Sequence, residues 1–437
     1  MTRRLLIEGG RVLDPAHGLD AICDVLIEDG VVRQVAPALR PHLPESGIEV
    51  IRAHGRWVLP GIVDMHVHLR EPGREEDETI ESGTRAAALG GVTTVLCMPN
   101  TLPPVDNPDK VGWVAKRAKE TAWVRVQVAG AVTVNQAGEE LAPLGGMADA
   151  GAIAFTDDGK PVSTAGFALQ CLERSHVHGT RLIEHCEDPS LSNGGCMNAG
   201  PVATAKGLKG IPNSSESALA ARDIEVLRRT RGKLHLAHIS TAETLGLLRR
   251  AKEDGLDVTG EVCPHHFTLA DEDIPELDTR YKMNPPLRSR ADVEALQRAI
   301  AGGLVDVIAT DHAPHAAEKK AKPFAEAPFG IIGLETLVPL SLSLVRAGLL
   351  TPLRWAHLLT AGPAAVLGLR GAGTLAPGSV ADLVVVAPDL EHRMDLFRSK
   401  SDNSPFRGKL LQGFATTTVI GGRVVMQDGE LVQRPDL

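Results

Sequence analysis

The chain is poor in aromatic residues, and it carries no long basic or hydrophobic run. Aromatic side chains make up 3% of its 437 residues, with one tyrosine, and the formal net charge is -9. An acidic chain without a basic run is a poor partner for nucleic acid, whose phosphates attract clustered lysine and arginine. The most apolar segment, residues 330–350, is interrupted by Glu335, Pro339 and Arg346, so we expect no membrane span.

Cysteine is also scarce, and the six cysteines are scattered singly along the sequence. The paired spacing that is typical of a disulfide framework is absent. The opening residues, MTRRLLIEGG, contain no apolar run of the length that a signal peptide needs. We therefore expect free thiols and a cytoplasmic protein.

Between about residue 58 and residue 315, short β-branched runs alternate with longer segments of helical periodicity. The runs are WVLPGIVDMHVHL, GVTTVLCMP, VRVQVAGAVT, AIAFTDD, RLIEHC, LHLAHIS, LDVTGEVCPHH and VDVIATDHAP. Near-continuous apolar strands between helices are typical of a parallel sheet covered by helices. Eight such units in about 260 residues predict an α/β fold of the (β/α)8 TIM-barrel type. A doubly wound open sheet is the alternative, but no Gly-rich phosphate turn follows an early strand.

The two ends of the chain have a different pattern. LLIEGGRVLD (5–14) and TTVIGGRVVMQDGELV (417–432) each predict a β-hairpin around a Gly-Gly pair. We predict that residues 1–57 and 370–437 form a small composite β-rich, sandwich-like domain. Residues 58–369 then form the barrel, and their helical last part leads from the barrel to the β-rich domain.

Metal-binding residue types gather at the ends of the predicted strands, where barrels of this type place their catalytic groups. They are His66 and His68 on the first strand, Asp157 and Asp158 on the fourth, Glu184 and His185 on the fifth, His238 on the sixth and Asp311 on the eighth. Each alone has an ordinary explanation, such as a buried core histidine or an Asp-Asp-Gly turn. Their coincidence at five strand ends predicts a site for Zn²⁺ or a similar divalent ion.

Side-chain alternation along a strand places His66, His68 and Arg70 on one face. Two imidazoles and a guanidinium make a poor packing surface but suit a metal site beside an anionic substrate. The same alternation predicts that His235 faces the opposite side of its strand from His238.

Two further histidines, His265 and His266, end the seventh strand. We predict that they support the site or the fold rather than bind the metal.

Eight motifs together carry a resemblance to a known family. They are DMHVHLREPG (64–73), CMPNT (97–101), FTDDG (155–159), EHCED (184–188), AHIST (237–241), YKMNPPLRS (281–289), IATDHAPH (308–315) and APFG (327–330). In this order and at this spacing, the chain resembles the class I bacterial dihydroorotases of the amidohydrolase superfamily. The flanking β-rich segments fit the composite domain of that family.

The resemblance implies a role for each matching position. One metal ion would be held by His66, His68 and Asp311, a second by His185 and His238, and Asp158 would bridge them. The implied metal is Zn²⁺, one or two ions per subunit, with other divalent ions left open. The substrate would contact His68, Arg70, Asn100 and His315 near its carboxylates, and Asn284, Phe329 and Gly330 near its ring. Asp311 would double as the catalytic proton shuttle.

The implied reaction is the reversible conversion of N-carbamoyl-L-aspartate into L-dihydroorotate, a ring closure in de novo pyrimidine synthesis. Its chemistry suits these residues, because a metal lowers the pKa of bound water from 15.7 to about 7 and a neighbouring carboxylate can carry the proton. Arginine can pair with a carboxylate through two hydrogen bonds, which lysine cannot reproduce. The resemblance also implies a homodimer and leaves open a complex with aspartate transcarbamoylase.

Two other functions stay open at this point. Hydantoinases, dihydropyrimidinases and allantoinases are similar cyclic amidohydrolases, but the first two bridge their metals with a carboxylated lysine on the fourth strand. The local candidate here, Lys160, lies past Gly159 and is predicted to lie outside the barrel. A non-catalytic scaffold subunit would have lost metal ligands, whereas every position is filled here. Residues 312–330 are either an ordinary solvated loop or a mobile lid over the site.

Overall fold

The fold is described from a computed structural model that covers residues 3–43 and 46–437. Eight parallel strands form the centre of the protein. In chain order they are β6 (Ile62–Val67), β7 (Val92–Cys97), β8 (Arg125–Gly130), β9 (Ala152–Phe155), β10 (Arg181–Glu184), β13 (Leu234–Leu236), β14 (Val258–Val262) and β15 (Val307–Ile308). A parallel bridge between Val67 and His312 joins the last strand to the first and closes the sheet. The predicted (β/α)8 barrel is confirmed.

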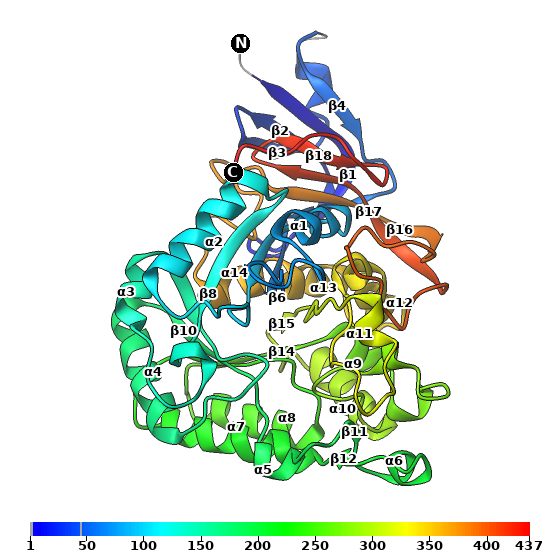
Figure 1. Ribbon diagram of the computed structural model, residues 1–437. Coiled ribbons are helices and arrows are strands. Elements are labelled where there is room, and N and C mark those ends of the chain that lie inside the picture. The colour runs from blue at the N-terminus through cyan, green and yellow to red at the C-terminus, as the bar shows by residue number, and fades with distance from the viewer. Residues whose placement is uncertain (1–2, 44–45) are drawn as a thin grey trace.

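Helices surround this barrel in a ring (Figure 1). They are α1 (Ile80–Leu89), α2 (Pro108–Thr121), α3 (Leu144–Asp149), α4 (Ala165–His178), α7 (Asn213–Leu227), α8 (Ala242–Glu253), α10 (Arg290–Ala301), α12 (Leu337–Arg346) and α13 (Pro352–Leu359), while α14 (Ala361–Leu367) packs against the barrel interior. Several begin at a side-chain cap, as where Thr79 and Thr241 accept hydrogen bonds from the backbone N–H groups of Ser82 and Thr244. Apolar side chains between helices and strands form the largest core.

Shorter elements lie in the loops. They are α5 (Pro189–Ser192), β11 (Met197–Asn198), α6 (Pro201–Ala205), β12 (Gly210–Ile211), α9 (Pro264–Thr268) and α11 (Ala317–Lys320), with 3-10 turns at Arg40–His42, Val134–Gln136, Asp271–Asp273, Thr279–Tyr281 and Leu334–Thr336. Many of them extend from the ends of the barrel strands, where the candidate site residues gather.

The interior of the barrel is divided along its axis. One part is filled by small and apolar side chains from successive strands, namely Val63, Met65, Leu96, Ala129, Ala154, Ile183, Ala237 and Val307, and α14 covers it with Ala364 and Leu367. The residues that line a polar cavity lie beyond this apolar part, at the C-terminal strand ends. The fold therefore concentrates the polar residues of eight distant segments in one place.

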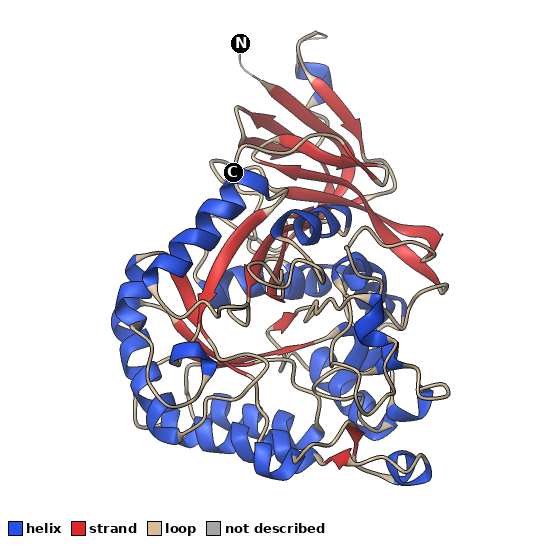
Figure 2. Ribbon diagram, in the orientation of Figure 1, coloured by secondary structure: helices blue, strands red, loops and turns tan. Residues whose placement is uncertain are grey.

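Strands from both ends of the chain form a second sheet, separate from the barrel strands in Figure 2. Its described strands are β1 (Arg4–Asp14), β2 (Leu19–Glu28), β3 (Val31–Ala36), β4 (Glu49–Arg52), β5 (Trp57–Pro60), β16 (Leu383–Arg393), β17 (Leu410–Ile420), β18 (Arg423–Gln427) and β19 (Glu430–Leu431). The two chain ends meet where β5 pairs antiparallel with β16. The predicted β-rich unit is present, while its boundaries at residues 57 and 370 stay a prediction, and residues 1–2 and 44–45 of that unit lie outside the described residues.

One hairpin prediction is confirmed and the other is wrong. Gly421 and Gly422 form the turn between β17 and β18. Gly9 and Gly10, by contrast, lie inside the continuous strand β1, where the register with β2 shifts as in a bulge. Gly9 has a φ of 70°, and a Cβ there would lie 2.5 Å from the His54 side chain, so glycine serves close packing rather than a turn.

Two further features of the chain are its cysteines and the length of its helices. All six cysteines are buried and free, as predicted. Within residues 3–43 and 46–437, no helix combines the length and the hydropathy that crossing a bilayer requires.

Candidate metal centre and substrate pocket

A polar cavity of about 350 Å³ opens at the C-terminal ends of the barrel strands. Its lining includes the predicted residues His68, Arg70, Asn100, Asp158, His185, His238, Asn284, Asp311, His315, Phe329 and Gly330. His66 is fully buried and contacts the same carboxylates. The fold therefore brings every residue of the predicted site together.

Asp158 lies at the centre of a cluster of four imidazoles and a second carboxylate. Its Oδ1 atom is 3.3 Å from His66 Nε2, and its Oδ2 atom is 3.3 Å from His68 Nε2. On the other side, Oδ1 is 3.5 Å from His238 Nε2 and 3.6 Å from His185 Nδ1. Asp311 completes the cluster with Oδ1 at 3.1 Å from His68 Nε2. The two ligand groups predicted for two metal ions thus meet at Asp158.

A buried glutamate fixes the orientation of His66. Glu261 on β14 accepts a hydrogen bond from His66 Nδ1 at 2.6 Å and lies 3.2 Å from His235 Nε2. Burial favours the neutral acid, but the charge and hydrogen bonds of these two imidazoles hold the pKa of Glu261 below its usual range. With Nδ1 donating to Glu261, His66 presents the Nε2 lone pair to Asp158, the tautomer that a metal ligand needs.

His68 and His185 are oriented in the same way by other partners. His68 Nδ1 donates to Asn100 Oδ1 at 2.7 Å, which leaves Nε2 facing the carboxylates. His185 Nε2 donates to Glu187 Oε2 at 3.1 Å, which leaves Nδ1 facing Asp158. Glu187 is stabilised further by Asn284 Nδ2 at 2.6 Å, and although burial opposes ionisation, His185 and these hydrogen bonds lower its pKa to about 2.

Several polar atoms of the cluster lack the partners that buried groups require. His66 Nε2, Asp158 Oδ1 and His238 Nδ1 are buried with no hydrogen-bond partner among residues 3–43 and 46–437. His185 Nδ1 and His238 Nε2 lie 2.9 Å apart. Two imidazole nitrogens are stable at that distance when a proton or a cation lies between them. The donor set of imidazole nitrogens and carboxylate oxygens therefore fits a divalent metal ion.

Three site residues adopt left-handed backbone conformations directly after their strands. The φ angles are 60° at Arg70, 31° at His238 and 48° at Asp311. Such angles are costly for residues with a Cβ and cluster at functional sites in proteins. Here they turn the side chains at the strand ends into the cavity.

The proposed substrate side of the cavity carries positive charge. Arg70 is 4% exposed and donates through Nε to the carbonyl oxygen of Pro314 at 3.1 Å. Burial, reinforced by the charge of Arg74, lowers the Arg70 pKa to about 10, so the guanidinium stays protonated at neutral pH. Burial together with the Arg70 charge lowers the pKa of His315 to about 2, and this neutral ring donates through Nε2 to the Phe329 carbonyl oxygen at 2.7 Å.

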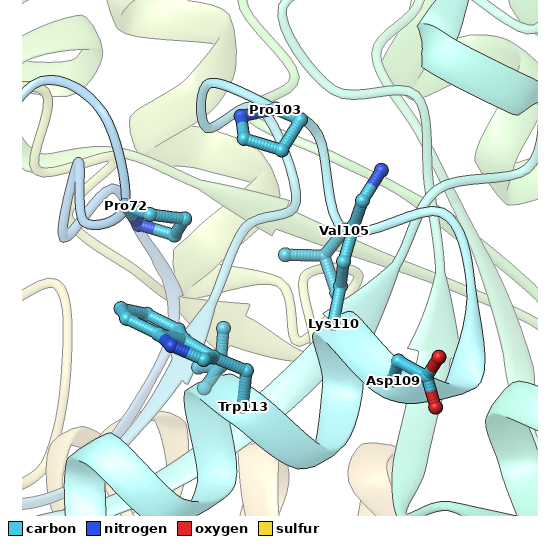
Figure 3. A pocket seen from close by; sticks show the side chains of 7 residues that line it. Pro72, Pro103, Val105, Asp109, Lys110 and Trp113 are labelled. Carbon is cyan, nitrogen blue, oxygen red and sulfur yellow. The ribbon is translucent and has the colours of Figure 1, made fainter.

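A second hollow, of about 380 Å³, lies beside α2 (Figure 3). Its wall is formed mainly by Pro72, Pro103, Val105 and Trp113. It contains none of the imidazoles of the cluster described above, so the polar cavity is the candidate active site.

Comparison with known proteins agrees with this geometry. Residues 55–244 match the family model described as Dihydro-orotase-like. The chain is 50% identical to a dihydroorotase of Pelotomaculum thermopropionicum, over 97% of this chain and 99% of the relative. It is 46% identical to a dihydroorotase of Anaeromyxobacter dehalogenans, over 98% and 99% of the two chains. The chain belongs to the dihydroorotase family.

Solved structures place the dihydroorotase fold of this chain next to that of the hydantoinases. An L-hydantoinase (dihydropyrimidinase) from Arthrobacter aurescens superimposes with a TM-score of 0.89 at 26% identity, covering 99% of this chain and 98% of that one. The fourth barrel strand, β9, has the sequence AIAF and contains no lysine. Lys160 is exposed, lies past the end of β9 as predicted, and donates to the carbonyl oxygen of Gln136 at 3.0 Å. The dihydroorotase relatives and this strand both argue against the hydantoinase alternative.

Two residues that the strand-end pattern counted as metal-capable do not face the cluster. Asp157 accepts hydrogen bonds from the backbone N–H groups of Val132 and Thr133. Glu184 Oε1 accepts from the backbone N–H of Val162. Each directly precedes a cluster residue, Asp158 or His185, so its side chain points the other way and holds a loop.

The prediction for His235 is wrong. Its ring faces the barrel interior, donates to or accepts from Thr259 Oγ1 at 2.8 Å and contacts Glu261. Alternation fails between His235 and His238 because the chain leaves β13 at Leu236 and turns through the left-handed angle of His238. Glu261 itself was missed, although a single acid within the apolar run VTGEVCP (258–264) is a signal of a buried, paired carboxylate.

Proposed function

We propose that the protein catalyses the reversible cyclisation of N-carbamoyl-L-aspartate to L-dihydroorotate, in de novo pyrimidine synthesis. The observation that supports this most directly is the convergence of four imidazoles, three of them held by a hydrogen-bond partner, and two carboxylates on a cavity that also contains Arg70. The relatives named above carry the same activity in their names. A scaffold role would not require this complete ligand set.

The proposed ligands are His66, His68 and Asp311 for one ion, His185 and His238 for the other, and Asp158 between them. We propose Zn²⁺ because imidazole and carboxylate are its usual ligands in catalytic sites. When bound, such an ion supplies the positive charge that lowers the pKa of water and polarises a carbonyl oxygen. Glu261, Asn100 and Glu187 keep three of the imidazoles in the tautomers that this requires.

Asp311 is the proposed proton carrier. Burial opposes its ionisation, but the neighbouring His66 and His68 hold its pKa below the usual range, so it is a carboxylate at neutral pH. In the ring-opening direction it accepts a proton from the attacking water as the C–O bond forms. It then delivers that proton to the ring nitrogen as the C–N bond breaks, which is general base followed by general acid catalysis.

The proposed substrate contacts divide between the carboxylate and the ring. Arg70 and His315 line the cavity, and Asn100 has its Nδ2 group left to donate because Oδ1 is used by His68. These groups would bind the free carboxylate. Asn284 and the Phe329–Gly330 turn, which borders His315, also line the cavity and would contact the ring.

The assembly and location implied by the family stay proposals. We propose a homodimer in the cytoplasm, and light scattering of the purified protein tests the dimer. Co-purification with aspartate transcarbamoylase tests the complex with that enzyme.

Ultraviolet detection of dihydroorotate consumption by the purified protein tests the proposed reaction. Turnover of dihydroorotate with bound metal is the expected result. A protein that contains metal and hydrolyses dihydrouracil or hydantoin instead would overturn the proposal, and one that binds no metal and turns over neither would favour the scaffold.

Replacement of Arg70 by lysine is expected to raise KM for dihydroorotate by about tenfold, with a smaller change in kcat. Lysine keeps the charge but cannot form two parallel hydrogen bonds with a carboxylate, and one charged hydrogen bond is worth about 1.5–3 kcal/mol. Steady-state kinetics measure the change. Exposed Arg52, changed to lysine, is the matched control, and equal KM values for Arg70→Lys and the parent would refute the carboxylate contact.

A further inference from the structure

Lys320, at the end of α11, is a buried lysine inside the segment that follows Asp311. It is 6% exposed, and Phe324 in the same segment is 4% exposed, so this segment is packed against the barrel rather than fully solvated. The Nζ atom of Lys320 donates to the carbonyl oxygens of Lys282 at 3.1 Å, Pro328 at 3.0 Å and Gly330 at 3.0 Å. No carboxylate lies within ion-pair distance of Nζ in the described part of the chain.

These three carbonyl groups belong to the two segments that form the ring side of the cavity. Lys282 is two residues before Asn284, and Pro328 and Gly330 flank Phe329. The two segments also contact each other, because the backbone N–H of Gly330 donates to the Lys282 carbonyl at 3.0 Å. One ammonium group therefore ties both proposed ring-contacting segments together.

An ammonium group suits this position because it has three N–H donors and no acceptor. Three carbonyl oxygens use all three donors, and the cost of burying the charge is offset by these bonds. A second lysine acts on the same turn from another side. Lys282 Nζ donates to the carbonyl oxygens of Phe324 at 2.7 Å and Ala325 at 3.1 Å, and it lies 4.5 Å from the centre of the Phe329 ring.

We propose that Lys320 is a positioning residue for the dihydroorotase reaction. Its ammonium group holds the Phe329–Gly330 turn against the Asn284 segment, so that the ring side of the cavity is formed before the substrate binds. This inference rests on the proposed function, which assigns Asn284 and Phe329 to the substrate ring.

The positioning role has a consequence for pH. Burial and the charge of Lys282 lower the pKa of Lys320 to about 7, while Asp278 acts in the opposite direction. Burial and the charges of Arg70, Lys320 and Lys319 lower the pKa of nearby His315 to about 2, so it is neutral at this pH. Below the Lys320 pKa the ammonium donates three hydrogen bonds, whereas above it the amine has two N–H groups and turns a lone pair towards one carbonyl. KM is therefore expected to rise as the pH increases through neutrality.

The test compares Lys320→Met with Lys322→Met, which removes the same charge from an exposed position two residues away. For Lys320→Met we expect KM for dihydroorotate to rise about tenfold, in line with lost charged hydrogen bonds. Its kcat should fall by less than about threefold, because the metal cluster and Asp311 are unchanged. Metal content and circular dichroism should match the parent. The parent KM should rise from about pH 6 to pH 8, and this rise should be absent in Lys320→Met.

Asn284→Ala, measured in parallel, distinguishes a failure of the Lys320 positioning role from a failure of the proposed ring contacts. If Asn284→Ala raises KM while folded Lys320→Met lowers only the melting temperature, Lys320 is merely structural and the inference is wrong. If Asn284→Ala leaves KM unchanged, the proposed ring contacts fail first, and the inference falls with them. Should Lys320→Met not fold, Lys320→Gln keeps two N–H donors and the same readouts apply, with an unchanged KM and pH profile refuting the role.

Discussion

Asp311→Asn is expected to lower kcat for dihydroorotate by about a thousandfold, within the range of general acid–base catalysis. The carboxylate lies 3.1 Å from His68 Nε2 and lines the cavity, where the proposed mechanism requires it to reach both the water and the ring nitrogen. Asparagine has the same shape and keeps one oxygen for a metal, but it cannot accept and return a proton. The measurement is the steady-state rate, together with metal analysis by mass spectrometry.

Asp149→Asn, at the exposed end of α3, is the control for loss of a negative charge, and it should behave as the parent. A variant at position 311 that keeps both metal and full activity would exclude the proton-carrier role. One that loses metal and activity in proportion would show that Asp311 acts only as a ligand.

Glu261→Gln is expected to weaken metal binding by about 10–100-fold, the usual effect of removing a carboxylate that orients a ligand. Glu261 is fully buried and holds both His66 and His235. The glutamine amide would present an N–H group to one of these imidazoles, so the tautomer of His66 would no longer be fixed. Metal retained after dialysis against a graded series of chelator concentrations measures the effect, and added zinc should restore part of the activity.

Glu253→Gln, on the exposed end of α8, is the control for this change. Equal metal retention in Glu261→Gln and the parent would show that the Glu261 carboxylate is not needed to orient His66. Loss of activity with unchanged metal content would point to a role in the reaction instead.

The barrel and the residues of its polar cluster could be predicted because their signals are local in sequence. Parallel strands buried on both faces require near-continuous apolar runs, and histidines or aspartates that interrupt the ends of such runs stand out. His66, His68, Asp158 and Asp311 were therefore visible without any knowledge of contacts. The resemblance of the motifs then assigned Asn100 and Asn284, whose residue types alone carry little information.

The supporting residues could not be predicted in the same way. Glu261 matters because it contacts His66, which is far away in sequence. Glu187 is only two residues from His185, but its second contact, with Asn284, is also distant in sequence. His235 was misplaced because alternation holds only while the backbone stays extended, and the chain turns at His238. A Gly-Gly pair in the sequence is typical of a turn. Here Gly9 and Gly10 lie at an irregularity of β1, where the His54 side chain packs too close to Gly9 to leave room for a Cβ.

The pairing of β5 with β16 has a consequence for how the chain folds. During synthesis β5 emerges before any barrel strand, and its partner follows only after the whole barrel has left the ribosome. Until then one edge of β5 has unpaired backbone groups that could join another chain. Contacts between such distant segments also slow folding and prolong exposure to aggregation. We therefore expect the final strands, far from the metal cluster, to govern the yield of folded protein.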